Sequence, residues 1–249
     1  MIEDGDVVSI LGPNGVGKTT LAKSICRMRK PDAGIIVVDD RDIREYRPRE
    51  FARHLSYVPQ RALAASMTVF DSILTGRRPH IDWAVTGRDE AIAWDVLSLF
   101  SMEHLALKNI DEISGGELQK VQIARAVVQN AGAMILDEPT NNLDLANQHS
   151  VLGLIRRIVK TNDSCAVMIM HDINTAACYS DRFVFMKKGR IQSYGGREAI
   201  TPETVEEVYG VRSEVMTVDG LPVVVPRIDG RAGSSPDGGM PEWMRGGAG

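Results

Sequence analysis

The chain has 249 residues, of which 43% are hydrophobic and 25% are charged, and its formal net charge is −4. These values are ordinary for a folded globular protein, and the acidic balance provides no basic face, so we expect no nucleic-acid partner. The cysteines Cys26, Cys165 and Cys178 are far apart and form no CxxC motif, which argues against a disulfide framework or a zinc site. No apolar stretch is long enough to cross a bilayer, so at a membrane another chain has to supply the spanning helices.

The first 60 residues alternate between strand and helix signals. A short apolar run over residues 7–11 ends at Gly12-Pro13, as a buried strand does. Apolar residues at helical spacing predict a helix over 19–28, and runs of β-branched and apolar residues predict strands over 34–38 and 55–58. This end of the chain therefore begins an α/β pattern.

Between residues 62 and 129 the pattern becomes mainly helical, and we interpret residues 61–130 as an inserted helical lobe. Strands alternating with helices resume after it, which implies a largely parallel sheet with helices on both faces. We expect one α/β domain over residues 1–229 and a disordered Gly/Pro-rich tail over 230–249. Helices are predicted over 69–75, 88–100, 115–129, 145–160, 173–180 and from Thr201-Pro202, and strands over 133–136, 165–170, 183–186 and 190–193.

A glycine-rich loop follows the first predicted strand and matches the phosphate-binding pattern GxxxxGK[ST]. Glycines let backbone N–H groups surround phosphate oxygens, and the N-terminus of the following helix adds partial positive charge. We expect Lys18 to reach the β- and γ-phosphates of ATP, Thr19 to ligate Mg²⁺, and Thr20 to hold the α-phosphate side. The bare pattern arises by chance in roughly one chain in a hundred of this length, and the strand–loop–helix context is rarer still. The loop consists of Gly12, Pro13, Asn14, Gly15, Val16, Gly17, Lys18 and Thr19.

Two acids end the predicted strand over 133–136. We expect Asp137 to hold Mg²⁺, directly or through water, and Glu138 to polarise the attacking water. Phosphoryl transfer depends mainly on positioning and charge stabilisation, which two carboxylates beside a lysine-bearing loop can supply. Alone, an acidic strand end is equally consistent with a solvated turn, and only together with the phosphate loop does it indicate ATP hydrolysis.

The predicted helix over 115–129 opens with Ser114-Gly115-Gly116-Glu117. Ser114 and Glu117 have the spacing of a capping box, so a helix cap alone is one interpretation. A Ser-Gly-Gly sequence at a helix N-terminus is also suited to binding an anion. Because this segment lies in the helical lobe, away from Lys18, it would have to meet the phosphates bound by a second protomer.

These segments together resemble the ATP-binding subunits of ABC transporters. The phosphate loop, the signature Ile113-Ser114-Gly115-Gly116-Glu117, the ILDEPTNNLD segment and a later single histidine occur in the family's order, over about residues 4–209. The resemblance implies a P-loop NTPase core, a small antiparallel β part and an inserted helical subdomain. It also implies a head-to-tail dimer, either a homodimer or a pair with a related ATPase subunit. Each of two ATP molecules would lie between Lys18 of one protomer and Ser114 and Gly116 of the other.

The resemblance assigns roles to three further residues. Gln60 is similar to the loop glutamine that senses Mg²⁺ and couples to the membrane subunit, although a glutamine after a strand is more commonly a surface residue. His171 is similar to the switch histidine that contacts the γ-phosphate, and Asp144 to the dimer-facing acid that links the two sites. The partners implied are two transmembrane permease subunits and an extracytoplasmic substrate-binding protein, with this chain peripheral at the cytoplasmic face of the cell membrane.

A weaker likeness concerns the subfamily. The segment Gly76-Arg77-Arg78-Pro79-His80 resembles the GR-x-PH segment of importers for iron-siderophores, haem and cobalamin, and its alternative interpretation is a plain helix-ending turn. Two other functions stay open at this point. One is a soluble ATPase of the same fold that assembles or repairs another complex, and the other is a nucleotide-binding partner subunit without catalysis.

The chain differs from the family at its N-terminus. Only eleven residues precede Gly12 and none is aromatic, whereas the family has two more strands there and an aromatic residue that stacks on adenine. Such a stack contributes about 1 kcal/mol beyond area burial. We interpret the difference as a start codon that lies upstream of Met1, with a truncated variant as the alternative.

Overall fold

The computed structural model describes residues 1–60, 66–141 and 143–227, so the predicted tail and the start of the predicted lobe fall outside the described residues. Its centre is a six-stranded sheet in the order β4-β5-β6-β1-β7-β8. The first five strands of that order are parallel, and β8 runs antiparallel to β7. The strands are β1 (Val7–Leu11), β4 (Leu55–Val58), β5 (Ala133–Asp137), β6 (Cys165–Ile169), β7 (Arg182–Lys187) and β8 (Arg190–Gly195).

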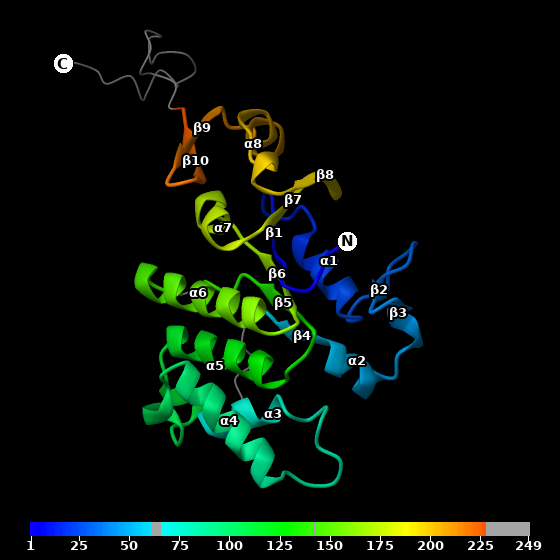
Figure 1. Ribbon diagram of the computed structural model, residues 1–249, viewed down its shortest axis with the longest axis vertical. Coiled ribbons are helices and arrows are strands. Elements are labelled where there is room, and N and C mark those ends of the chain that lie inside the picture. The colour runs from blue at the N-terminus through cyan, green and yellow to red at the C-terminus, as the bar shows by residue number, and fades with distance from the viewer. Residues whose placement is uncertain (61–65, 142, 228–249) are drawn as a thin grey trace, which may run out of the picture.

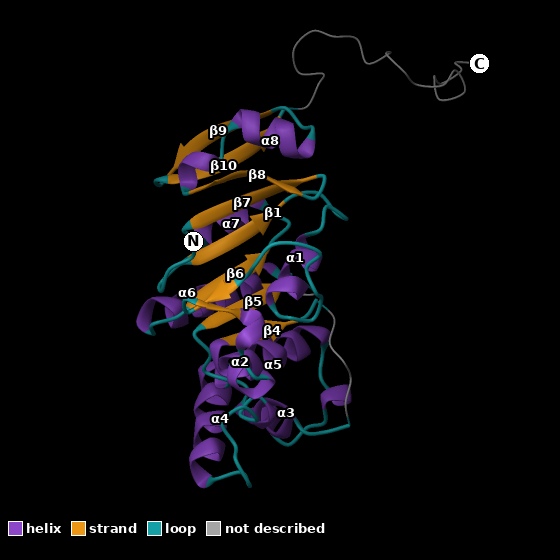
Figure 2. Cartoon of the chain, turned by 90° about the vertical axis from the view of Figure 1, so that its right-hand side faces the viewer, coloured by secondary structure: helices purple, strands orange, loops and turns teal. Residues whose placement is uncertain are grey.

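Helices cover both faces of this sheet (Figure 1 and Figure 2). All five residues of β1 are buried, as expected for a central parallel strand. Because side chains alternate along a strand, Val7 and Leu11 join one hydrophobic cluster, whereas Val8 and Ile10 join the other. The first cluster contains residues of α5 (Gly115–Val128), α6 (Leu145–Thr161) and α7 (Ile173–Tyr179). The second contains residues of α1 (Lys18–Ile25) and α2 (Pro48–His54).

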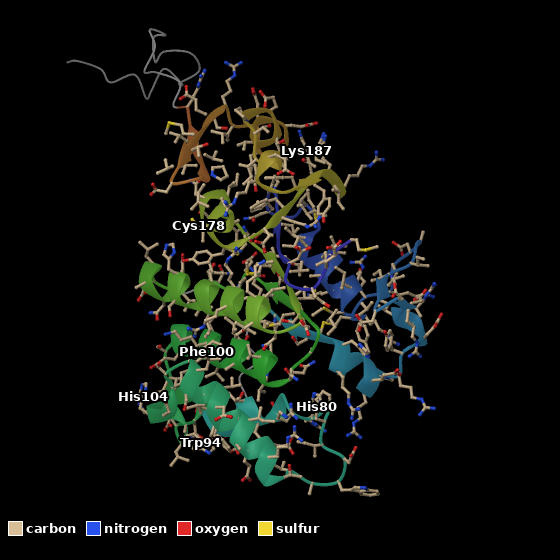
Figure 3. The ribbon with its side chains drawn as sticks, viewed as in Figure 1. His80, Trp94, Phe100, His104, Cys178 and Lys187 are labelled. Carbon is tan, nitrogen blue, oxygen red and sulfur yellow. The ribbon has the colours of Figure 1, made fainter. Side chains whose placement is uncertain are left out.

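Among the described residues, three α-helices form a helical lobe at one end of the molecule: α3 (Val69–Thr75), α4 (Gly87–Leu99) and α5 (Gly115–Val128). The rings of Phe70 and Trp94 pack with their centroids 4.9 Å apart between α3 and α4. Figure 3 shows Trp94, Phe100 and His104 in this lobe, far from Lys187 on β7. The predicted bounds of α3 are correct, and those of α4 and α5 are correct to within one residue.

The region after β7 contains one feature that the sequence analysis did not predict. The predicted turn at Lys188-Gly189 joins β7 to β8, and Thr201 caps α8 (Pro202–Tyr209) by accepting a hydrogen bond from the Thr204 amide at 3.1 Å. Beyond α8, β9 (Ser213–Val218) and β10 (Leu221–Pro226) pair as an antiparallel hairpin. Asn174 of α7 binds this hairpin, since its side chain both donates to and accepts from the backbone of Val224.

The segment between α1 and β4 is less regular than predicted. The predicted strand over 34–38 is reduced to β2 (Val37–Val38), which pairs with only two residues in β3 (Arg41–Asp42). The helix α2 that follows was not predicted. Within the part of the chain that the structure describes, no helix combines the length and the apolar composition needed to span a bilayer.

Candidate nucleotide-binding site

The predicted phosphate loop joins the carboxyl end of β1 to the N-terminus of α1. Gly12 has φ +148°, and a Cβ there would lie 2.3 Å from the Met186 carbonyl oxygen, so only glycine fits. Gly17 caps α1 in the left-handed conformation, with φ +107°. Lys18 then turns back over the loop, and its Nζ donates to the carbonyl oxygens of Gly12 at 2.6 Å and Pro13 at 3.0 Å. These carbonyls satisfy a buried ammonium that is only 5% exposed.

The first of the two acids, Asp137, lies at the end of β5 and is fully buried. Its two carboxylate oxygens have different donors. Thr19 Oγ1 donates to Oδ1 at 3.1 Å, and the hydroxyl of Tyr57 on β4 donates to Oδ2 at 3.3 Å. Burial raises the pKa of Asp137, while the hydrogen bonds from Thr19 and Tyr57 oppose that shift.

The second acid, Glu138, has a left-handed backbone with φ +56°, which is uncommon for a residue other than glycine. Its carboxylate receives three side-chain donors. His171 Nε2 lies 2.5 Å from Oε1, Asn141 Nδ2 donates to Oε2 at 2.5 Å, and Gln60 Nε2 also donates to Oε2. Burial raises the pKa of Glu138, but these hydrogen bonds more than offset it, so its pKa lies below the ordinary value.

Nine of the residues that the structure describes line a cavity of about 390 Å³ at this edge of the sheet. It brings together Lys18, Gln60, Glu138 and His171, which are up to 153 positions apart in the sequence. Burial lowers the pKa of Lys18, while Glu138 and Asp137 oppose that shift. The other lining residues come from the phosphate loop and α1: Asn14, Gly15, Gly17, Thr19 and Thr20.

The oxygen donors at this site fit Mg²⁺, which prefers hydroxyl, carboxylate and carbonyl ligands. Thr19 Oγ1 and Asp137 Oδ1 lie 3.1 Å apart. Two adjacent ligands of an octahedral Mg²⁺ lie about 3.0 Å apart, because each Mg–O bond is about 2.1 Å long. Thr19 and Asp137 are thus spaced as two neighbouring ligands. Thr19 and Gln60 line the cavity, whereas Asp137 is fully buried and is not among the lining residues.

Other predicted site residues do not line this cavity. Ser114 instead forms the predicted capping box, in which its N–H and Oγ donate to Glu117 Oε2 at 2.8 and 2.7 Å. Asp144 caps α6 and accepts from the Asn147 amide at 2.7 Å. Gly115 and Gly116 are the first two residues of α5. The predicted site residues are therefore not all brought together in one chain: several line the cavity, whereas the signature turn, residues 114–117, lies on the helical lobe.

Two residues that contact the acids, Tyr57 and Asn141, were not predicted. Asn141 lies in the turn after Glu138, where its N–H donates to the Glu138 carbonyl at 3.2 Å. Asparagine is common in turns, so an asparagine three residues after Glu138 could have indicated this contact. Tyr57 is 80 residues from Asp137 in the sequence, and only the pairing of β4 with β5 brings them together.

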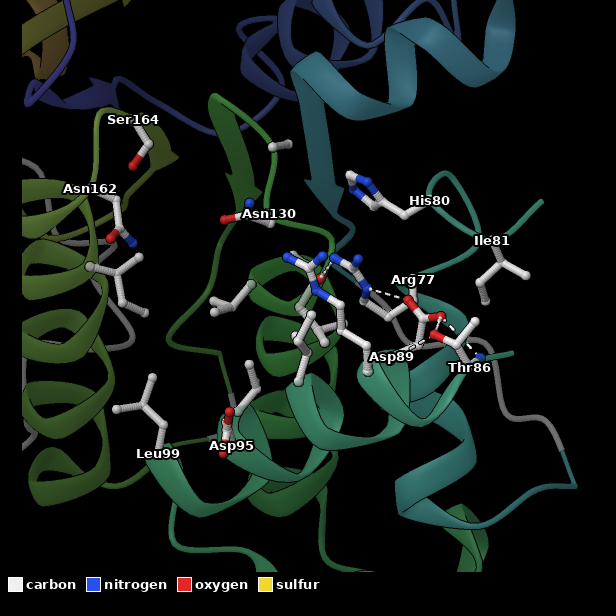
Figure 4. Close-up of a pocket in the computed structure, with 18 of the residues that line it drawn as sticks. Arg77, His80, Ile81, Thr86, Asp89, Asp95, Leu99, Asn130, Asn162 and Ser164 are labelled. Atoms are coloured by element: carbon white, nitrogen blue, oxygen red, sulfur yellow. Dashed lines mark hydrogen bonds and ion pairs between the residues drawn. The ribbon is translucent and has the colours of Figure 1, made fainter. Parts of the chain in front are cut away.

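A larger cavity of about 1490 Å³ lies elsewhere, between α4, the end of α5 and the end of α6 (Figure 4). Its main polar feature is structural. Arg77 Nε lies 3.1 Å from Asp89 Oδ1, and Thr86 Oγ1 donates to Asp89 Oδ2 at 2.6 Å, so these buried charges are satisfied within the fold. No predicted site residue is among those that line it.

Comparison with known proteins identifies the family. The family model described as ABC transporter matches residues 1–141. The chain belongs to this family. An uncharacterized ABC transporter ATP-binding protein of Methanocaldococcus jannaschii is 50% identical over 225 residues, covering 90% of this chain and 89% of that protein. A petrobactin import ATP-binding protein of Bacillus anthracis is 34% identical, covering 91% of this chain and 85% of that protein.

Solved structures of ABC proteins have the same fold. A transporter described as of metal-chelate type, in an inward-facing conformation, superposes with a TM-score of 0.78 and 27% identity, covering 91% of this chain and 88% of that one. As an ATP-binding subunit of the ABC family, the chain hydrolyses ATP. The predicted P-loop NTPase fold, with a mostly parallel sheet, is confirmed.

Proposed function

We propose that this chain is the energy-coupling ATPase subunit of an ABC importer for a metal chelate, such as an iron-siderophore, haem or cobalamin. The import function named for the B. anthracis relative and the metal-chelate type of the structural neighbour support this cargo class. The observation that carries the coupling role is the position of the segment 76–80. This segment follows α3 in the helical lobe, and a hydrogen-bond chain through His80 and Gln129 links it to β4, the strand that leads to Gln60.

Hydrogen bonds connect this segment, directly or through Gln129, with the part of the molecule that contains α2 and β4. The His80 ring nitrogen Nε2 lies 2.8 Å from the Gln129 carbonyl, and the Gln129 amide donates to the Leu55 carbonyl at 3.0 Å. Arg53 of α2 donates to the Pro79 carbonyl at 2.9 Å. A displacement of the lobe is therefore transmitted to the strand before Gln60, and Gln60 donates a hydrogen bond to the Glu138 carboxylate.

The cavity residues suggest how ATP is hydrolysed. Lys18 exchanges its loop carbonyls for the β- and γ-phosphate oxygens, and the loop amides, with Thr20, hold the remaining phosphate charge. Mg²⁺, when bound, neutralises charge that develops between the β- and γ-phosphates, and Thr19, Asp137 and Gln60 hold it. Glu138 orients and polarises the attacking water once Asn141, Gln60 or His171 releases one of its oxygens. His171 then contacts the γ-phosphate.

The second half of the site is supplied by a partner, either a second copy or a related ATPase subunit. Ser114, Gly115 and Gly116 offer a hydroxyl and backbone amides at the N-terminus of α5, where the helix dipole favours an anion. They do not line the cavity of their own chain. A head-to-tail dimer places them over the γ-phosphate of the other protomer, with Asp144 between the two sites.

In this arrangement the chain is peripheral at the cytoplasmic face of the membrane. Two permease chains span the bilayer, and an extracytoplasmic binding protein delivers the chelate. ATP binding closes the dimer and moves the permeases through Gln60 and the segment 76–80. Hydrolysis then lets the dimer reopen.

Co-purification tests this proposal. The chain is expressed with permeases encoded beside its gene and purified in detergent, and we expect it to be retained with a multi-spanning partner. Lys18→Ala is the matched control, because it should assemble equally well while losing ATP turnover. The transporter role is contradicted if the chain is recovered alone, or only with proteins that lack membrane spans, and still hydrolyses ATP. That result would favour an assembly ATPase.

The cargo class is tested on the purified complex. Binding protein loaded with a metal chelate is expected to stimulate ATP turnover in reconstituted vesicles, and the same protein without chelate is the control. The chelate assignment is excluded if no chelate stimulates ATP turnover while an unrelated solute, delivered by its own binding protein, does.

A further inference from the structure

The Asp137 carboxylate is held by two donors on opposite oxygens, and only one of them belongs to the nucleotide loop. Thr19, on α1, donates to Oδ1. The second donor, the Tyr57 hydroxyl, donates to Oδ2 at 3.3 Å from the edge strand β4, three residues before Gln60. Asp137 is 0% exposed, so no bulk water can replace that phenol without opening the fold.

The sheet fixes the position of this phenol. Tyr57 pairs in register with Ile135, and Asp137 is two residues farther along β5, so both side chains lie on the same face. On this face Tyr57 packs against the hydrophobic cluster that contains Ile135 and Phe51. A hydroxyl carried on a packed ring of a paired strand is therefore a fixed donor rather than a mobile one.

The Tyr57 hydrogen bond affects which oxygen faces the metal position. The terminal torsion of an aspartate is broad and roughly two-fold, so packing alone does not fix the carboxylate plane. With Oδ2 held by Tyr57, Oδ1 is directed at Thr19 Oγ1, at the spacing of two adjacent Mg²⁺ ligands. Without the phenol, Oδ2 is buried without a donor, which costs free energy. Rotating the carboxylate toward a remaining donor lowers that cost, so the carboxylate no longer keeps its orientation.

We propose that Tyr57 is a positioning residue for the metal: its hydroxyl orients Asp137 and thereby sets the affinity of the site for Mg²⁺. This rests on the proposed role of Asp137 as a metal-holding residue. Tyr57 does not line the nucleotide cavity, and its part in metal binding is exerted through Asp137. It also lines a separate cavity of about 440 Å³ together with Gly76, Arg78 and Pro79, so the same side chain borders the helical lobe.

The test is Tyr57→Phe, which removes one oxygen atom and retains the ring. Binding of Mn²⁺, which accepts the same oxygen ligands, is titrated by electron paramagnetic resonance with ADP present. We expect the Mn²⁺ dissociation constant to rise about fivefold, which corresponds to about 1 kcal/mol. In hydrolysis assays, the Mg²⁺ concentration for half-maximal rate should rise in parallel, while the rate at saturating Mg²⁺ stays within about twofold of wild type.

Two control variants separate this role from general effects. Tyr46→Phe removes another tyrosine hydroxyl from the same hydrophobic cluster, one that donates to the Val38 carbonyl at 2.7 Å, and should leave Mn²⁺ affinity unchanged. Asp137→Asn should weaken Mn²⁺ binding more than Tyr57→Phe. If Asp137→Asn weakens binding and Tyr57→Phe does not, the positioning role is wrong and the metal assignment stands. If Asp137→Asn has no effect on Mn²⁺ affinity, the metal assignment is wrong, and the role of Tyr57 falls with it.

Discussion

The phosphate-loop cavity and the helical lobe use their polar groups in opposite ways. In the cavity, Lys18 is paired with carbonyls of its own loop, and Glu138 with amide and imidazole donors. These partners can be exchanged for phosphate oxygens or water. In the lobe, Arg77 and Asp89 are paired with each other inside the fold. The difference shows which polar groups are available for chemistry and which maintain the shape that presents them.

The signature turn at Ser114 lies on the helical lobe, but its polar groups, like those of the cavity, can exchange their hydrogen-bond partners. Its capping box is exposed, so Ser114 Oγ can accept a new partner at small cost. The buried Arg77–Asp89 pair cannot, because separating buried charges leaves one of them unpaired. Substitutions of exchangeable groups should therefore change binding or turnover, and substitutions of groups paired inside the fold should change stability.

Lys18→Ala should have the largest effect on binding. It removes two charge-assisted contacts to phosphate, each worth about 1.5 kcal/mol, so the dissociation constant for ATP should rise roughly 100-fold. Isothermal titration calorimetry measures this, with Lys30→Ala as a control for loss of an exposed positive charge. An unchanged affinity in Lys18→Ala means that the loop does not bind the triphosphate.

Asp89→Asn should leave ATP affinity unchanged and lower the free energy of unfolding by about 3 kcal/mol, because it leaves Arg77 buried without its counter-ion. Hydrogen bonds from Thr86, followed by Arg77, lower the pKa of Asp89 in the folded state. The stabilisation is therefore present above the unfolded pKa of about 3.9 and is lost as the pH falls through the lower folded value.

Urea unfolding at pH 7 and at lower pH checks this prediction. The difference between wild type and Asp89→Asn should be large at pH 7 and shrink below about pH 4. Asp95→Asn, an exposed acid on the same helix, is the control. A difference that does not depend on pH would mean that the lost contacts are not ionic.

Gly76→Ala should destabilise the lobe by about 2 kcal/mol through overpacking. A Cβ at this position lies 2.2 Å from the Arg125 carbonyl oxygen and 2.5 Å from Val128 Cγ1. Gly87→Ala is the matched control, since a Cβ there meets nothing within 4 Å. Thermal unfolding of the two variants should separate clearly, and equal melting temperatures would show that α3 can move away from α5 without cost.

Ser114→Ala should have the smallest effect on the isolated chain. Loss of the cap costs about 1 kcal/mol of stability, and ATP binding to the monomer should not change. ATP turnover should nevertheless fall about tenfold, because the partner's γ-phosphate loses a donor. Thr68→Ala removes a comparable cap from α3 and should leave turnover unchanged. Equal turnover in both variants argues against a shared site.

Local signals predicted most of the fold and the segments that carry most of the candidate site. The phosphate loop, the signature turn and the acids at the end of β5 each carry their pattern within a few residues. The β9–β10 hairpin was missed although Asp219-Gly220 is a strong hairpin turn signal. The Tyr57–Asp137 contact could not be predicted, because it depends on the pairing of β4 with β5, strands that are 75 or more residues apart in the sequence.

The most direct test of the account is Glu138→Gln, which keeps the shape of the side chain but removes its charge. ATP affinity should stay within about twofold of wild type, while single-turnover hydrolysis should be slower by on the order of 10²- to 10³-fold, because the attacking water loses its base. Glu103→Gln, on the helical lobe, should hydrolyse ATP normally. Hydrolysis at the wild-type rate by Glu138→Gln would contradict the assignment of Glu138 and the chemistry built on this cavity.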